Sequence, residues 1–381
     1  MPIEREVFAA LFTNSVVSSY AGVRSALAGA PLPLKEFLKL ARQAEIPYPL
    51  FFAPKQVVDE QLRLKNEKLM AGFTKTSLSM HSRHRVELCD VELIVKDLLR
   101  KQEILRRYDR TLPKNGLVGL LKKSRGSIPQ DADRLLEALG MTRADIRSSR
   151  SKEAALELII GRLEARQVLV SRSAQHYMPQ EMPGHAKFSG MTIKDKKVPF
   201  VFLATGDEGE HLEPAGRKVF TLVLLTVLIA HETFAPVNYD GHTKELDAPR
   251  VYQLAAEILM PAAEMRRLSF PDLEAARALA DAFKVTPSAV VMRARRLGCI
   301  DPDTFSRYMD ELEVEYNSRT TPTLSSPRPV NALRKYNGTE CSRRMLAVLD
   351  AGHLNRAEFR RIMFFNKIPA SQIDDFREAV R

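Results

Sequence analysis

The longest apolar run of the chain covers residues 219–230 and contains no charged side chain. A helix that is hydrophobic on all sides is buried in a protein core, whereas a helix that crosses a bilayer needs roughly 20 apolar residues. This run is too short for a membrane span. It predicts a fully buried helix over residues 217–233.

Other stretches carry the hydrophobic periods of amphipathic helices and short strands. Apolar side chains at helical spacing predict helices over residues 91–98, 131–139, 152–166 and 249–259. Two short runs rich in β-formers and flanked by turn residues predict strands over residues 167–170 and 198–203. The pattern therefore predicts an α+β protein that is mostly helical and has a small sheet.

A helix, a short turn and a second helix are predicted over residues 272–298. Thr286 can cap the N-terminus of the second helix, and Pro287 suits its first position. Gly298 follows the end of that helix, where a left-handed residue is common. The segment is therefore helix-turn-helix-like.

The second of these helices has two interpretations. Its spacing places Val290 and Ala294 inward and leaves three arginines, Arg293, Arg295 and Arg296, largely outward. Outward arginines can contact phosphates or enter the major groove of DNA. A groove-reading helix usually also offers Asn or Gln, which this helix lacks. The alternative is a helical pair that closes the core, with arginines that are merely solvated.

Composition narrows the class of partner and the compartment. A net charge of +11 and a pI near 9.5 favour an acidic partner, of which nucleic acid is the commonest. Cys89, Cys299 and Cys341 lie far apart and form no Cys-x-x-Cys pair, which indicates free thiols. The first residues lack the basic-then-apolar pattern of a signal peptide. We expect a cytoplasmic protein without a membrane partner.

A stretch rich in Pro, Ser and Thr over residues 317–330 predicts a linker. Changes in composition and hydrophobic pattern along the chain then predict six regions. They are an N-terminal helical domain, a helical region, a core, the helix-turn-helix-like unit, the linker and a C-terminal helical module. In this order, the predicted boundaries are 1–60, 61–150, 151–265, 266–316, 317–330 and 331–381.

Several segments resemble, in the same order, those of the long ImmA/IrrE-type zinc metallopeptidases, which carry an N-terminal Xre-type domain. Residues 188–190 match a Phe-x-Gly strand, and residues 255–261 match an Ala-Ala-Glu-x-Leu-x-Pro helix. Further matching segments are residues 38–54, 198–202, 220–222, 282–298 and 343–354. The resemblance implies a degenerate Xre-like N-terminus, a zincin-like core, a helix-turn-helix-like unit and a helical tail.

The departures from the family bear on catalysis. In the family, a Phe-Thr-Leu lead, here residues 220–222, runs into His-Glu-x-x-His, whose histidines share a zinc ion and whose glutamate is the general base. Leu224, Leu225 and Leu228 stand at these positions. Ala248 stands where the resemblance places the third, acidic ligand. None of these side chains can donate a lone pair, so the core is expected to be a pseudo-metallopeptidase without a metal or another cofactor.

A relocated zinc site is the alternative. His231 and Glu232 resemble the start of a metal motif, with Glu232 as the base. His242 would be the second ligand, and Asp247 or Glu257 would complete the set. The simpler interpretation is a surface His-Glu pair at the end of a helix.

Other candidate chemistry is weaker. His81 and His84 lie in a basic segment that could contact nucleic acid or a partner, or form a solvated turn. His176 and His185 flank a loop that would lie near the former cleft. The glycines of residues 206–216 lack the spacing of a phosphate-binding loop.

These features predict a catalytically inactive regulator that binds a protein partner such as a toxin or a repressor, with DNA as a further candidate partner. A bacterial or phage toxin–antitoxin, stress or defence locus is what the resemblance implies, because active members of the family cleave a repressor. The first alternative is an active zinc endopeptidase that uses the relocated site. The second is a basic DNA-binding transcriptional regulator.

Overall fold

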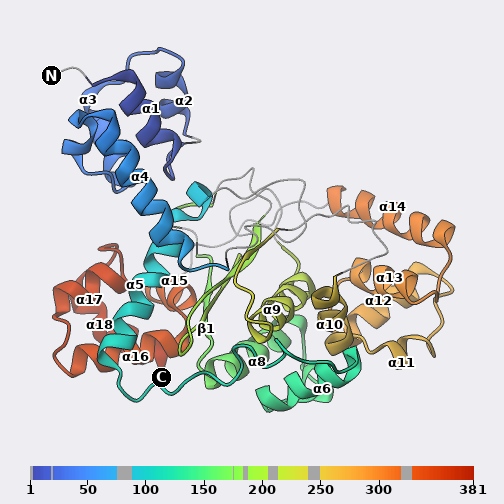
Figure 1. The fold of residues 1–381 in the computed structure, drawn as a ribbon. Coiled ribbons are helices and arrows are strands. Elements are labelled where there is room, and N and C mark those ends of the chain that lie inside the picture. The colour runs from blue at the N-terminus through green and yellow to red at the C-terminus, as the bar shows by residue number, and fades with distance from the viewer. Residues whose placement is uncertain are drawn as a thin grey trace.

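The computed structural model describes residues 3–18, 20–74, 88–174, 176–182, 188–204, 213–238, 249–318 and 328–381. Helices dominate, and a small sheet lies among them (Figure 1). The predicted α+β class with mostly helical content is confirmed. The α-helices are α1 (Arg5–Thr13), α2 (Ala21–Leu27), α3 (Leu34–Gln43), α4 (Lys55–Met70), α5 (Glu92–Tyr108), α6 (Ile128–Leu139), α7 (Arg143–Arg147), α8 (Lys152–Ala165), α9 (Ala215–Ala230), α10 (Arg250–Leu259), α11 (Ala262–Met265), α12 (Leu273–Ala282), α13 (Pro287–Arg296), α14 (Pro302–Ser318), α15 (Pro329–Asn337), α16 (Thr339–Asp350), α17 (Arg356–Met363) and α18 (Ile373–Val380). The 3₁₀ helices and strands are η1 (Tyr48–Phe52), η2 (Leu88–Asp90), η3 (Ala370–Gln372), β1 (Leu169–Arg172), β2 (Phe188–Ile193), β3 (Phe200–Leu203) and β4 (Pro236–Asn238).

The sheet is mixed and has the strand order β1-β3-β2-β4. β1 runs parallel to β3, whereas β2 is antiparallel to both of its neighbours. The two runs predicted as strands fall on β1 and β3, and the Phe-x-Gly segment of the resemblance lies in β2. The sequence does not predict β4, because three residues that begin with a proline show no alternation.

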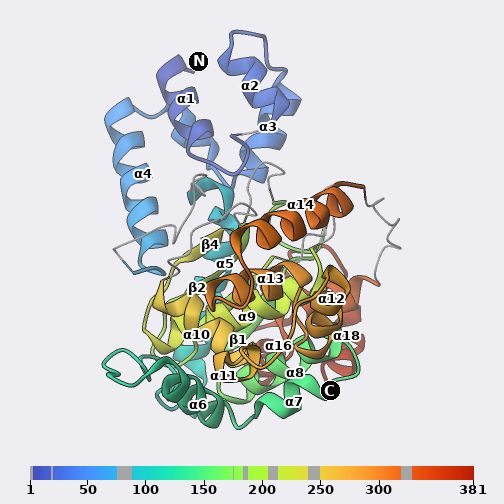
Figure 2. The same ribbon diagram turned by 90° about the vertical axis from the view of Figure 1, so that its right-hand side faces the viewer.

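Helices cover both faces of the sheet (Figures 1 and 2). Val201 and Leu203 of β3 pack into the hydrophobic cluster that contains α8, α9 and α10. Phe200 and Phe202 point to the other face and pack with α5 and the C-terminal helices. All four side chains are fully buried. The C-terminal helices are therefore part of the core around the sheet.

The N-terminal helices build a hydrophobic cluster of their own. It spans residues 7–58 and includes Leu93 of α5. Figure 1 shows α1 to α3 projecting from one end of the molecule, with α4 leading back to the rest of it. The N-terminal region is thus helical as predicted, and its likeness to an Xre domain stays a prediction.

The helix-turn-helix-like unit consists of α12 and α13. Thr286 caps α13 by accepting a hydrogen bond from the backbone N–H of Ala289 at 3.3 Å, as predicted. A Cβ on Gly216, near the start of α9, would lie 2.4 Å from the carbonyl carbon of Val285. The unit therefore packs tightly against the start of α9. Most of the linker predicted over residues 317–330 lies outside the described residues.

Candidate functional site

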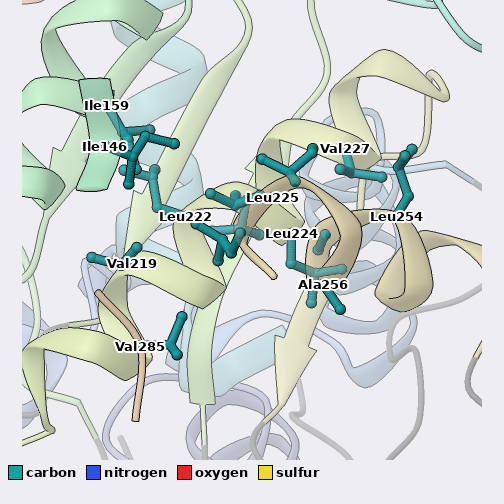
Figure 3. Packing of buried hydrophobic residues seen from close by; sticks show 14 of the residues in the cluster. Ile146, Ile159, Val219, Leu222, Leu224, Leu225, Val227, Leu254, Ala256 and Val285 are labelled. Carbon is teal, nitrogen blue, oxygen red and sulfur yellow. The ribbon is translucent and has the colours of Figure 1, made fainter. Parts of the chain in front are cut away.

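α9 carries the three positions at which the resemblance places two zinc ligands and a general base. Leu224, Leu225 and Leu228 are 3%, 0% and 1% exposed. Figure 3 shows Leu224 and Leu225 among side chains of neighbouring elements, including Ala256 of α10. The predicted fully buried helix is confirmed, with bounds three residues or fewer from those expected.

The Phe-x-Gly strand lies directly beneath this part of α9. A Cβ placed on Gly190 of β2 would lie 2.9 Å from Cδ1 of Leu225 and 2.6 Å from the carbonyl oxygen of Phe202. Leu225, which stands where the resemblance places the catalytic glutamate, thus occupies the space above the glycine. Hydrocarbon fills the place where the family would need a carboxylate and a water molecule.

The donor set at these positions does not fit zinc. Zinc binds nitrogen, oxygen or sulfur ligands in a tetrahedral array, and the three leucines offer none. Ala248, the fourth predicted position, lies outside the described residues. Within the described part of the chain, no three His, Cys, Asp or Glu side chains are grouped so that they could hold a metal ion.

The residues of the relocated site have other partners. Nδ1 of His231 lies 2.9 Å from the carbonyl oxygen of Val227 at the end of α9. Glu232 accepts a hydrogen bond from Nζ of Lys122 at 2.8 Å, and this bond lowers the pKa of its carboxyl. A general base works best when its pKa lies near the operating pH, so Glu232 is suited to ion pairing. His242 and Asp247 lie outside the described residues.

Glu257, the other candidate acid, is buried in an ion pair with Arg293. The pair joins α10 to α13, and Glu257 also accepts a hydrogen bond from the backbone N–H of Ala262 at 3.1 Å. Nε of Arg293 donates to the carbonyl oxygen of Met260 at 3.2 Å. Arg293 is only 8% exposed, so the predicted outward orientation of this residue is wrong. Arg293 turns inward because its guanidinium pairs with the buried carboxylate of Glu257.

The other two predicted arginines are only half-buried. Burial and the nearby charge of Arg293 lower the pKa of Arg296, and Arg295 lies beside it on the same helix. A role of these two residues in nucleic-acid binding stays a prediction. The Glu257–Arg293 pair joins α13 to α10, as the alternative interpretation expects of a helix that closes the core, but Arg293 is buried in the pair and is not merely solvated.

The remaining candidates do not converge on a site. His176 is exposed, with Nδ1 3.6 Å from Oε1 of Glu181. His81, His84 and His185 lie outside the described residues. The three cysteines are free thiols, as expected.

Comparison with known proteins adds no assignment. The chain matches no protein-family model, no curated protein and no solved structure. None of the helices in the described ranges combines the length and hydropathy that a bilayer crossing requires. Membership of the ImmA/IrrE-type family therefore stays a prediction that rests on the motifs.

Proposed function

We propose that this protein is a catalytically inactive, ImmA/IrrE-like regulator that binds a protein partner in a bacterial or phage toxin–antitoxin, stress or defence locus. The observation that carries the proposal is the burial of Leu224, Leu225 and Leu228 at the positions of the metal motif. Burying a leucine contributes about 1.5–3 kcal/mol. The leucines therefore stabilise the core by packing, in the place where a peptidase would bind metal.

A protein partner is supported by the apolar surface of the N-terminal helices. Among the described residues, the exposed large hydrophobic side chains are Leu34, Phe52, Val57, Leu64 and Val314. The first four lie on α3, η1 and α4. Val57 also lines a hollow of about 460 Å³ together with Ile46 and Leu50. Exposed large apolar side chains on the N-terminal helices favour protein contacts there.

The partner is expected to be a repressor or a toxin encoded beside this protein, and to remain intact when bound. Co-expression with the products of the neighbouring genes, followed by size exclusion and intact-mass measurement, tests both points. We expect a stable complex, an uncleaved partner and zinc far below one equivalent. A cleaved partner, or stoichiometric zinc that disappears in His231→Ala or His242→Ala, would establish the peptidase alternative instead.

A matched pair of variants tests the surface. Phe52→Ser combined with Val57→Ser should abolish the complex, because both side chains are exposed on the N-terminal helices. Val314→Ser removes an exposed side chain from α14 and should leave the complex intact. An undiminished complex in the double variant would contradict this assignment of the surface.

A further inference from the structure

A basic edge is formed where the end of α5 and the loop between α5 and α6 pass the turn between β2 and β3. Its side chains come from residues 106–125 and 194–197, and all but Lys197 are exposed. The members of the basic edge are Arg106, Lys114, Lys122, Lys123, Arg125, Lys194, Lys196 and Lys197.

Hydrogen bonds and an ion pair bring these segments together. The backbone N–H of Asn115 donates to the carbonyl oxygen of Lys196 at 2.9 Å. Nη1 of Arg106 lies 3.2 Å from Oδ2 of Asp195. The pKa of Glu232 is lowered by its hydrogen bond to Lys122 and also by the charges of Lys194 and Lys196. The basic side chains of the two segments therefore lie close together and form one positively charged surface.

The carboxylates that pair with the basic edge are few. Asp195 is buried and also fixes the turn, because its Oδ1 accepts hydrogen bonds from the backbone N–H groups of Lys197 at 2.7 Å and Val198 at 2.9 Å. Glu232 is the other carboxylate, and it pairs with Lys122. Asp109, the other carboxylate in these segments, pairs with Arg344 of α16. Two carboxylates against eight basic side chains therefore leave a strong excess of positive charge on the basic edge, three of whose members lie on a turn whose backbone is held in place.

We propose that the basic edge binds the phosphate backbone of duplex DNA. Exposed lysines and arginines bind phosphates with a strength that depends on salt and little on sequence. The aromatic residue in these two segments is Tyr108, whose half-buried ring stacks on that of His353 at 4.6 Å, so the segments offer no free platform on which unpaired bases could stack. This surface is separate from the partly buried arginines of α13 and does not depend on the proposed protein partner.

The apolar surface argues against a lipid or protein occupant at this edge. Membrane-surface segments and protein interfaces both combine charge with exposed apolar side chains. Among the described residues, the exposed large hydrophobics lie on α3, η1, α4 and α14, and none lies on the basic edge.

The test is fluorescence anisotropy of a short random-sequence DNA duplex titrated with the full-length protein over a range of salt concentrations. Lys194→Glu combined with Lys196→Glu should weaken binding and reduce the slope of log K against log salt by about 2. The matched control is Lys35→Glu combined with Lys39→Glu, which makes the same change in net charge on exposed positions of α3. We expect the control to retain the slope of the unmodified protein.

Three results would overturn the proposal. They are no binding by the unmodified protein at low salt, equal losses in both double variants, and tighter binding to single-stranded DNA, anionic vesicles or polyglutamate than to the duplex. The substituted side chains are exposed, and a thermal melt confirms that each variant is folded. The complex with a protein partner should survive in Lys194→Glu/Lys196→Glu, so failure of this proposal is distinguishable from failure of the proposed function.

Discussion

At the scale of single residues, a buried ion pair holds two helices of the core together. The guanidinium of Arg293 and the carboxylate of Glu257 lie between α13 and α10, and each also bonds to the backbone near the end of α10. Removing one partner of such a pair leaves the other charge buried without compensation, which costs more than the intact pair contributes.

Arg293→Ala should therefore destabilise the protein by about 3–5 kcal/mol. Arg295→Ala, two residues further along α13 and only half-buried, should cost far less. Urea denaturation of both variants measures the difference. Equal losses of stability would show that the Glu257–Arg293 pair has no special role in joining the two helices.

Glu164 makes stability depend on pH. Burial raises the pKa of its carboxyl to about 7. Hydrogen bonds from the backbone of Thr339 and Glu340, at the start of α16, lower the pKa by less than burial raises it, and Oε1 lacks a hydrogen-bond partner. A raised pKa favours folding while the group is protonated, so this contribution is complete below the unfolded value of 4.5 and is lost as the pH rises to about 7.

Glu164→Gln should remove this dependence. The stability of the unmodified protein relative to the variant should fall by up to about 1.4 kcal/mol per pH unit across that window. Glu157→Gln is the control, because Glu157 is exposed and pairs with Arg172 at the surface. Denaturant melts at several pH values provide the measurement, and parallel curves for the unmodified protein and Glu164→Gln would refute the assignment.

At the scale of elements, the approach of α9 to β2 depends on the absence of a side chain. Gly190→Ala would force a Cβ against the backbone oxygen of Phe202 and against Leu225. A backbone atom cannot move aside as the end of a side chain can, so we expect a loss of roughly 1–3 kcal/mol, as for other overpacked cores. Thermal unfolding measures it.

Gly161 supplies the control for that substitution. It lies within α8, and a Cβ placed on it would meet nothing within 4 Å. Gly161→Ala should stabilise the protein by about 0.5–1 kcal/mol, because alanine favours the helix over the unfolded chain. Destabilisation by both substitutions to a similar extent would mean that the contact between α9 and β2 is not the cause.

The sequence predicts elements where the local pattern is strong. α8 and α9 begin and end within three residues of the predicted bounds, because long apolar periods fix a helix without help from distant residues. The leucines of the candidate site are likewise buried as predicted. The predicted orientation of Arg293 is wrong because its partner, Glu257, is 36 residues away in the chain. A local hydrophobic period carries no information about a contact at that distance.

At the scale of the whole molecule, the C-terminal helices close the core. Nζ of Lys101 in α5 is fully buried, and it donates to Oδ2 of Asp97 at 2.5 Å and to Oδ1 of Asn337 at 2.6 Å. The hydroxyl of Tyr336 also donates to Asp97, at 2.9 Å. The sequence predicts a separate module over residues 331–381, and it gives no sign of this network, whose two halves on α5 and α15 lie more than 200 residues apart.

A chain that ends after Ser318 should therefore fail to fold. Without the C-terminal helices α15 to α18, the shortened chain would expose the face of the sheet that carries Leu169, Phe200 and Phe202, all fully buried in the complete chain. Solubility and circular dichroism of the shortened chain test this. Co-expression of residues 328–381 as a separate chain should restore a soluble, folded complex, because the C-terminal helices bind the sheet through side-chain packing and the buried Lys101 network. A shortened chain that is soluble, monomeric and fully folded by itself would show that the C-terminal region is an independent domain after all.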